Sequence, residues 1–244
     1  MIKNANLVIT LDGPAGSGKS TLAKILAEEL GLYQIDSGAL YRAYTFLALE
    51  LLKGDSGKLL SSMQKSEFIN QLKSHEVEIS FKDFRQQVWV DKTRLSQELR
   101  TPEVTQNIKS IADNRPLREH INAKLRTLSE TYPIVADGRD MGTVVFPEAD
   151  IKFFVTASVQ ERALRRYEEM KEKFPDIELL ELEEQIASRD RQDQEREFGQ
   201  LKQADDAIFI DTTGHSLKAV LGNLKGILKN TLPEHLLRKI NLKI

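Results

Sequence analysis

The stretch "LDGPAGSGKSTLAK" at residues 11–24 decides the fold of this chain. It holds three glycines and a proline, and its loop ends in a lysine, a serine and a threonine. Glycine in such number weakens both helix and strand, so the bare backbone must serve another purpose. The apolar run "NLVIT" (6–10) before it predicts a buried strand. The run "KSTLAKILAEEL" (19–30) after it predicts a helix, because its leucines recur on one face and Gly31 follows as a stop signal.

Residues 13–20, "GPAGSGKS", match the pattern G-x-x-x-x-G-K-[ST] between that strand and that helix. A loop without side chains lets backbone N–H groups converge on polyphosphate oxygens, and the helix N-terminus adds its dipole. Lys19 supplies a positive charge to the β- and γ-phosphates, and Ser20 offers a hydroxyl to Mg²⁺. We expect this loop to bind a nucleoside triphosphate through Gly13, Pro14, Ala15, Gly16, Ser17, Gly18, Lys19, Ser20 and Thr21.

Composition narrows the partners of the chain. The 244 residues carry a net charge of −2, so no global basic field is available to hold nucleic acid. Cysteine is absent, which excludes disulfides, thiol catalysis and cysteine-ligated metals, and the four histidines lie far apart. No signal-peptide pattern and no apolar run of membrane-spanning length is found. We therefore expect a cytoplasmic protein that binds neither nucleic acid nor membrane.

Strand and helix patterns alternate along the chain, which predicts a parallel sheet with helices on both faces. Residues 76–100 break this alternation with short runs typical of a small inserted antiparallel sheet. A helix is predicted from Thr101 to about Leu128, and a capping box at Ser158–Glu161 opens another, which Pro175 breaks before a second, acidic helix. The predicted strands after the first are "LYQID" (32–36), "YPIVAD" (132–137), "IKFFVTA" (151–157) and "DAIFID" (206–211).

Two further motifs follow predicted strands, at the sheet edge where ligands of open α/β proteins bind. In "DSGALYR" (36–42), Arg42 is suited to a bidentate pair with a phosphate. In "VADGRDMGTVVF" (135–146), Asp137 is placed to hold waters around Mg²⁺, Arg139 to clamp a phosphate and Asp140 to accept hydrogen bonds from a ligand. The alternative for this second motif is a surface turn with an Asp–Arg ion pair.

The run "SRDRQDQER" (188–196) places Arg189, Asp193 and Arg196 on one helix face. Such a charge run is ordinarily a solvated, salt-bridged helix, and the same holds for the arginines at 162, 165 and 166. Phosphoryl transfer nevertheless needs positioned cations around the moving group, and two arginine-rich helices suit a closing lid.

Taken together, these motifs closely resemble the bacterial type of cytidylate kinase over nearly the whole chain. "DSGALYR" and "DGRDMGTVVFP" are the specific part of the resemblance, and "ERALRR", "SRDRQD" and "ADDAIFIDTTG" extend it. The resemblance implies an α/β fold: a P-loop three-layer sandwich with a parallel sheet, a small antiparallel-sheet insert and a helical lid. It implies a core at 1–60, 133–160 and 200–244, a monophosphate-binding insert at 61–132 and lid helices at 161–199.

The resemblance also implies a reaction, the transfer of the γ-phosphate of ATP to CMP or dCMP with Mg²⁺. We expect the protein to be a monomer. Ser37, Arg42 and Arg139 would hold the acceptor phosphate, joined by Arg189 and Arg196 when the lid closes. Asp193 would receive the sugar hydroxyls, and Asp140 with Arg118 would read the cytosine edge. No covalent nucleophile is needed, because the acceptor phosphate attacks directly. The catalytic set would be Lys19, Arg139, Arg189 and Arg165, with Ser20 and Asp137 at the metal.

Two positions depart from the family pattern. A serine that helps to read cytosine in the family aligns with Lys109, with Ser110 adjacent, and Gln200 stands where a Pro-Leu pair normally begins. Two other functions stay open at this point. One is a P-loop kinase acting on a different small molecule, and the other is a nucleotide-sensing protein with little turnover, which would not need a second phosphate clamp.

Overall fold

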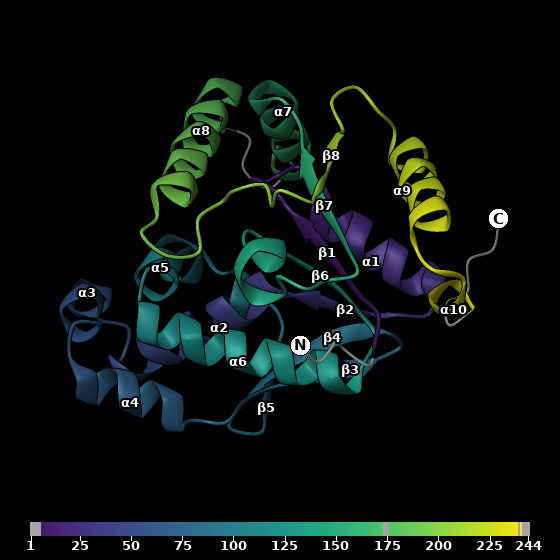
Figure 1. Cartoon of the computed structure of the whole chain (residues 1–244). Coiled ribbons are helices and arrows are strands. Elements are labelled where there is room, and N and C mark those ends of the chain that lie inside the picture. The colour runs from purple at the N-terminus through teal and green to yellow at the C-terminus, as the bar shows by residue number, and fades with distance from the viewer. Residues whose placement is uncertain (1–5, 173–175, 239, 241–244) are drawn as a thin grey trace.

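The structure, a computed structural model, describes residues 6–172, 176–238 and 240. Its centre is a five-stranded sheet in the order β2-β6-β1-β7-β8, in which every neighbouring pair is parallel (Figure 1). This confirms the predicted α/β fold with a parallel sheet. The strands are β1 (Val8–Asp12), β2 (Tyr33–Asp36), β6 (Ile134–Gly138), β7 (Ile151–Thr156) and β8 (Ile208–Asp211).

The central strand β1 is buried along its whole length, which explains its uninterrupted apolar sequence. Successive side chains point to opposite faces, so Val8 packs into one hydrophobic core and Ile9 and Leu11 pack into the other. Burial on both sides requires a layer of helices on each face of the sheet.

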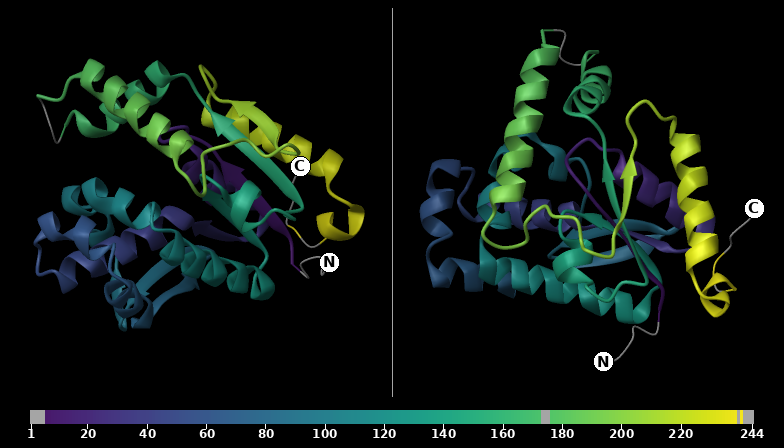
Figure 2. Two further views of the ribbon diagram at one scale, coloured as in Figure 1. Left: turned by 60° about the vertical axis from the view of Figure 1, so that its left-hand side comes forward. Right: turned by 45° about the horizontal axis from the view of Figure 1, so that its top comes forward.

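The helices α1 (Lys19–Leu30) and α9 (Leu217–Thr231) cover the face that receives Ile9 and Leu11, with the short α10 (Glu234–Leu237) beside them (Figure 2). The opposite face is covered by α2 (Ser37–Leu51) and α6 (Arg115–Thr131). The molecule is therefore a three-layer sandwich, and α1 has the bounds expected from its sequence.

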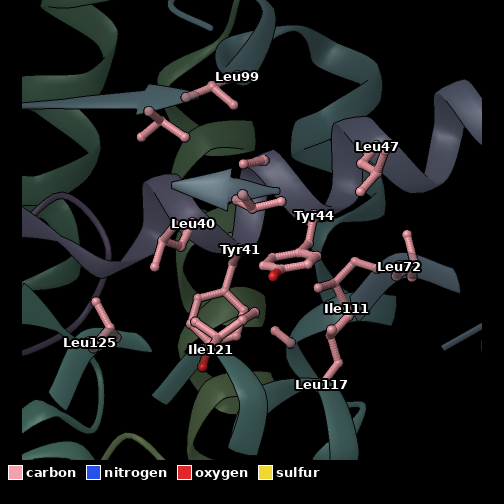
Figure 3. Close-up of a cluster of buried hydrophobic side chains, with 14 of the residues drawn as sticks. Leu40, Tyr41, Tyr44, Leu47, Leu72, Leu99, Ile111, Leu117, Ile121 and Leu125 are labelled. Atoms are coloured by element: carbon pink, nitrogen blue, oxygen red, sulfur yellow. The ribbon is translucent and has the colours of Figure 1, made fainter. Parts of the chain in front are cut away.

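A second, antiparallel sheet lies beyond α2 and consists of β3 (Val77–Lys82), β4 (Arg85–Val90) and β5 (Thr93–Leu95), as predicted. The sheet contributes Val77, Val88, Val90 and Leu95 to one core with side chains of α2, α6 and α5 (Pro102–Ala112). Figure 3 shows the rings of Tyr41 and Tyr44 among Ile111, Leu117 and Ile121 of that core. The short helices around this sheet are α3 (Leu59–Ser62), α4 (Ser66–Ser74) and α5.

The single helix expected from Thr101 to about Leu128 is wrong, because α5 ends at Ala112 and α6 begins at Arg115. The side chain of Asn114 accepts a hydrogen bond from the backbone N–H of Leu117 at 3.0 Å and so caps the second helix. A proline stands in the first turn of α6, where a missing N–H does no harm. The chain therefore turns between two helices whose ends carry functional side chains.

Two helices, α7 (Val159–Met170) and α8 (Leu179–Glu195), form a pair at the edge of the molecule (Figure 1). Within the described residues their shared core consists of Ala163, Leu182 and Ile186. Ser158 caps α7 by accepting the N–H of Glu161 at 3.2 Å, which confirms the serine half of the predicted capping box. The reciprocal half is not formed, because Ser158 N–H donates to Thr213 and the Glu161 side chain pairs with Arg165. The predicted break at Pro175 lies outside the described residues. None of the helices in the described part of the chain combines the length and apolarity needed to span a bilayer.

Candidate active site

A cleft of about 1510 Å³ opens at the carboxyl edge of the parallel sheet, between α2 and α5 on one side and α7 and α8 on the other. It is lined by all the residues that the sequence predicts to bind nucleotide or metal, except Gly13 and Pro14. The structure thus brings into one space motifs that are up to about 180 residues apart in the chain. The lining includes residues 15–21, Ser37, Arg42, Arg118, Asp137, Arg139, Asp140, Arg165, Arg189, Asp193 and Arg196.

The glycine-rich loop lies so close to β7 that a side chain at its first glycine is impossible. A Cβ atom on Gly13 would lie 1.9 Å from the carbonyl oxygen of Val155. Gly16 and Gly18 have φ angles of +77° and +83°, in the left-handed region that favours glycine. Because its N-cap is Gly18, α1 has no capping side chain of its own, and its first amides are free to meet an anion.

Lys19 is buried in this loop, and its Nζ donates to the carbonyl oxygen of Pro14 at 2.8 Å. Burial lowers the pKa of Lys19 to about 7, and the nearby guanidinium of Arg139 adds to the shift. The ammonium form of Lys19 is therefore disfavoured until a further negative charge arrives, as expected where a polyanion binds.

Asp137, at the end of β6, links the loop to the neighbouring strand. Its carboxylate accepts a hydrogen bond from the Ser20 hydroxyl and one from Gln34 Nε2 at 3.2 Å. The backbone oxygen of Asp137 accepts the hydroxyl of Ser37 at 2.9 Å. Burial raises the pKa of Asp137 to about 6, and the charge of Asp36 adds to this rise. A buried carboxylate beside a hydroxyl is thus fixed next to the loop.

Arginines crowd the other half of the cleft. Burial, together with the charge of the nearby Arg139, lowers the pKa of Arg189 to about 10. Burial also lowers the pKa of Arg42, with Arg100 and Arg139 adding to the shift. Cations that depress one another's pKa form a strongly positive pocket, and such a pocket favours a second anion. Arg100, which lines the cleft beside Arg42, was not singled out by the sequence.

Arg139 reaches from the loop after β6 to α8, where its Nε donates to Asp193 Oδ2 at 2.8 Å. The other carboxylate oxygen of Asp193 accepts Arg196 Nη2 at 2.7 Å. Burial raises the pKa of Asp193, but Arg139 and Arg196 outweigh that effect and hold the pKa below its ordinary value. The alternative of a surface turn therefore does not describe Arg139, which bridges the core and α8.

Arg118 and Asp140 form an ion pair with side chains only 3% and 2% exposed. Arg118 Nη1 donates to the carbonyl oxygen of Ala112 at 3.0 Å, whereas its buried Nε has no hydrogen-bond partner in the described part of the chain. Burial raises the pKa of Asp140, and the Arg118 guanidinium opposes this shift only in part. Gly199 closes over the pair, since a Cβ there would lie 2.2 Å from Arg118 Nη2.

A family model described as cytidylate kinase matches residues 9–230 of this chain. The chain belongs to the cytidylate kinase family. The family is one of ATP-dependent nucleoside monophosphate kinases, so the glycine-rich loop and the arginine pocket lie in the cleft of a kinase.

Relatives in the cytidylate kinase family match along almost their full length. The chain is 42% identical over 225 residues to the cytidylate kinase of Exiguobacterium sibiricum, covering 92% of this chain and 97% of that protein. It is 40% identical over 219 residues to the cytidylate kinase of Bacillus thuringiensis, covering 90% and 94%. The crystal structure of TT1252 from Thermus thermophilus superposes with a TM-score of 0.46 and 16% identity, over 93% of this chain and 99% of that one.

Two arginines of this kinase lie between α7 and the glycine loop. Arg165 donates to the Thr212 carbonyl oxygen at 2.9 Å and lies beside Gly18. Arg162, which the sequence left as a solvated helix residue, is instead buried. Its Nη1 donates to Ala15 O at 3.0 Å and also pairs with Asp190 of α8 at 2.6 Å. Arg162 therefore joins the phosphate loop to both helices of the predicted lid.

The sequence analysis assigned no role to Asp12, although this residue directly precedes the glycine loop of the kinase. Its two carboxylate oxygens accept the backbone N–H groups of Met141 at 2.8 Å and Gly142 at 2.6 Å. Burial raises the pKa of Asp12 to about 7 against the lowering effect of these two bonds. Asp12 thus fixes the π-helical turn η3 (Met141–Val145), which directly follows Asp140. An aspartate at the end of an apolar strand was the available signal.

Of the two residues at the first departure from the family pattern, Lys109 lines the cleft, whereas Ser110 is not among the lining residues. The ammonium group of Lys109 pairs with Asp113, one turn further along the chain.

Proposed function

We propose that this kinase transfers the γ-phosphate of ATP to CMP or dCMP, giving ADP and CDP or dCDP. The observation that carries the proposal is one cleft with two separate cationic sites, the glycine loop with Lys19 and the pocket around Arg42, Arg139 and Arg189. The polyphosphate of a nucleoside triphosphate needs one such site. The second cationic site is suited to the phosphate of an acceptor. The names of the relatives supply the cytidine part of the proposal.

The acceptor phosphate is assigned to Ser37, Arg42 and Arg139, with Arg189 and Arg196 completing its shell. Arg42 and Arg139 come from α2 and the loop after β6, whereas Arg189 comes from α8. A shell drawn from several parts of the chain fixes the phosphate in direction as well as in position. Asp193, already between Arg139 and Arg196, is assigned to the sugar hydroxyls.

The base is assigned to Arg118 and Asp140. A carboxylate accepts the cytosine amino group, and the unpartnered Nε of Arg118 is a buried donor for a base acceptor atom. Uracil carries a carbonyl in place of that amino group, and a site built to bond an amino group rejects such an analogue. This assignment predicts a preference for CMP and dCMP over UMP.

Transfer proceeds by in-line attack of an acceptor phosphate oxygen on the γ-phosphorus, without a covalent enzyme intermediate. Lys19, Arg139, Arg165 and Arg189 stabilise the charge that spreads over the transferred group. The small core between α7 and α8 and the Arg162 contact with the loop suit a lid that closes over both nucleotides.

Ser20 and Asp137 would hold Mg²⁺. Mg²⁺ keeps several waters and is bound by one or two carboxylates together with substrate phosphates, so a hydroxyl and a single carboxylate beside the loop fit it. The bound ion would supply charge neutralisation between the β- and γ-phosphates. No cluster of three or more acidic, histidine or cysteine side chains suited to a metal occurs among the described residues.

A panel of acceptors tests the proposal. The purified chain is assayed with ATP and Mg²⁺ against CMP, dCMP, UMP, AMP and GMP, and we expect the highest kcat/KM for CMP or dCMP. A higher value for another acceptor would make the chain a different small-molecule kinase. Tight ATP binding with no turnover on any acceptor would favour a nucleotide sensor. Cytoplasmic location, a monomeric state and the absence of a nucleic-acid partner stay predictions.

The substitution Asp140→Asn is expected to lower both stability and base discrimination. It leaves Arg118 as a buried charge without its partner, which costs roughly 3–5 kcal/mol of unfolding free energy. It should also narrow the CMP-to-UMP preference by about 1–3 kcal/mol. Urea unfolding and kcat/KM for both nucleotides check the two effects.

The control for that substitution is Glu234→Gln. Glu234 pairs with Arg238 at 2.6 Å, and both side chains are well exposed, so both measurements should change little. An unchanged CMP-to-UMP ratio in folded Asp140→Asn would show that Asp140 does not read the base.

ATP binding is expected to take up a proton from solution near pH 8. The pKa of Lys19 is about 7 without a ligand, so at pH 8 the amine is mostly neutral. The phosphates raise this pKa, and binding therefore draws in up to about one proton. Calorimetry in two buffers of different ionisation enthalpy measures the uptake. Lys19→Arg, whose guanidinium stays charged, should lose the uptake, and a buffer-independent enthalpy for the wild type would contradict the expectation.

A further inference from the structure

Five side chains of alternating charge are joined in a row beside the cleft, from α5 through the end of α8 to the loop after β6. The ammonium of Lys109 pairs with Asp113, and the other oxygen of Asp113 accepts Arg196 Nε at 2.8 Å. Arg196 Nη2 donates to Asp193, and Asp193 accepts Arg139 Nε. The proposed function uses Arg139, Asp193 and Arg196, but it leaves Lys109 and Asp113 without a role.

Asp113 occupies a fixed point of the backbone. It is the C-cap of α5, its N–H donates to Lys109 O at 2.9 Å, and it directly precedes Asn114, which caps α6. The amide of Asn114 also donates to Met63 O at 3.1 Å and so ties this corner to the short helices of the insert. The carboxylate of Asp113 is therefore presented to α8 from a rigid corner of the insert.

Arg196 is held by this carboxylate from one side and by Asp193 from the other. Its side chain is only 9% exposed, but that of Asp113 is 34% exposed, so solvent and salt reach their contact from the Asp113 side. The Nε and Nη2 groups are occupied, whereas Nη1 makes only a 3.5 Å contact with Gly199 O. The guanidinium is thus oriented before any acceptor is bound, with one nitrogen left for a further partner.

We propose that Asp113 is a positioning residue, which sets Arg196 for the acceptor phosphate and connects the insert to the end of α8. The inference rests on the proposed function, because it assigns Arg196 to the acceptor. A guanidinium that is already oriented loses less conformational freedom when the phosphate arrives, so Asp113 lowers the KM for CMP. Lys109 shares the same carboxylate and holds it at the corner.

The test replaces Asp113 by asparagine, which keeps the shape and removes the charge. We expect the KM for CMP to rise roughly 3- to 30-fold, with the KM for ATP changed less than about 2-fold and kcat changed less than the KM for CMP. Asp113→Glu keeps the carboxylate and should restore most of the affinity. The difference between wild type and Asp113→Asn should shrink as the salt concentration is raised.

Asp55→Asn is the matched control. Asp55 pairs with Lys58 at 2.6 Å in a neighbouring part of the chain, and both side chains are well exposed. The same chemical change there should leave the KM for CMP unaltered. Calorimetric titration with CMP alone provides a readout that does not depend on turnover, and it should follow the same order of affinities.

The outcomes separate the two proposals. If wild type turns over CMP and Asp113→Asn has an unchanged or lower KM for CMP, Asp113 does not position Arg196, and the proposed function stands. An equal rise in the KM values for ATP and CMP, or failure of Asp113→Glu to restore affinity, overturns the inference as well. If wild type neither binds nor phosphorylates CMP, the proposed function itself fails. Should Asp113→Asn not fold, Asp113→Ser supplies the neutral variant.

Discussion

Replacing Lys19 by alanine is expected to lower kcat by at least about 10²-fold while leaving the fold intact. The ammonium group lies in the glycine loop, where the proposed mechanism has its charge stabilise the phosphoryl group as it leaves ATP. Among the residues that the structure describes it forms one hydrogen bond, to Pro14 O, so its loss removes little structure. Its lowered pKa means that the unliganded fold bears a buried charge at a cost, and the alanine variant should not unfold more easily at neutral pH.

Steady-state kinetics and thermal unfolding of Lys19→Ala check both halves of this prediction. Lys225→Ala is the control, since Lys225 pairs with Glu29 on the surface at 2.7 Å and lies on α9. Near-normal turnover in folded Lys19→Ala would remove the glycine loop from the reaction.

Replacing Arg139 by alanine is expected to raise the KM for CMP and to lower kcat, by a combined factor of about 10² or more in kcat/KM. Arg139 stands between the acceptor arginines and α8, where it donates to Asp193. Its removal takes away one phosphate ligand and also releases Asp193 from its position. The KM for ATP should change less, because the glycine loop is untouched.

The comparison for Arg139→Ala is Arg126→Ala. Arg126 donates to the carbonyl oxygens of Val144 and Val145 in η3, and it is not among the residues that line the cleft. If ATP affinity collapsed in Arg139→Ala while CMP affinity stayed unchanged, Arg139 would belong to the donor site.

Local sequence chemistry predicted much of this architecture. The bounds of α1 followed from the glycine loop before it and Gly31 after it, and the cap of α7 followed from the side chain of Ser158. The edge position of the strand-end motifs followed from the parallel sheet, because all its strands present their carboxyl ends on one side. In such cases the determining partner lies within a few residues or is a backbone group.

What the sequence could not predict depends on contacts between distant segments. Asp12 looks like an ordinary strand-end aspartate until Met141 and Gly142 are placed beside it by the pairing of β1 with β6. The burial of Arg162 depends on Asp190 and on the phosphate loop, and neither is adjacent in sequence. The break between α5 and α6 was readable in Asn114 and the following proline, and it was missed because the apolar periodicity continued across it.

The transfer of phosphate from ATP to CMP is tested most directly with a label on the γ-phosphate. The purified chain is incubated with ATP labelled at the γ-position, CMP and Mg²⁺, and the nucleotides are separated. We expect the label to appear in CDP, one equivalent for each ADP formed. Lys19→Ala and Arg139→Ala should each suppress the labelling of CDP. Label released only as inorganic phosphate, or retained in ATP at every CMP concentration, would contradict a cleft that holds donor and acceptor together.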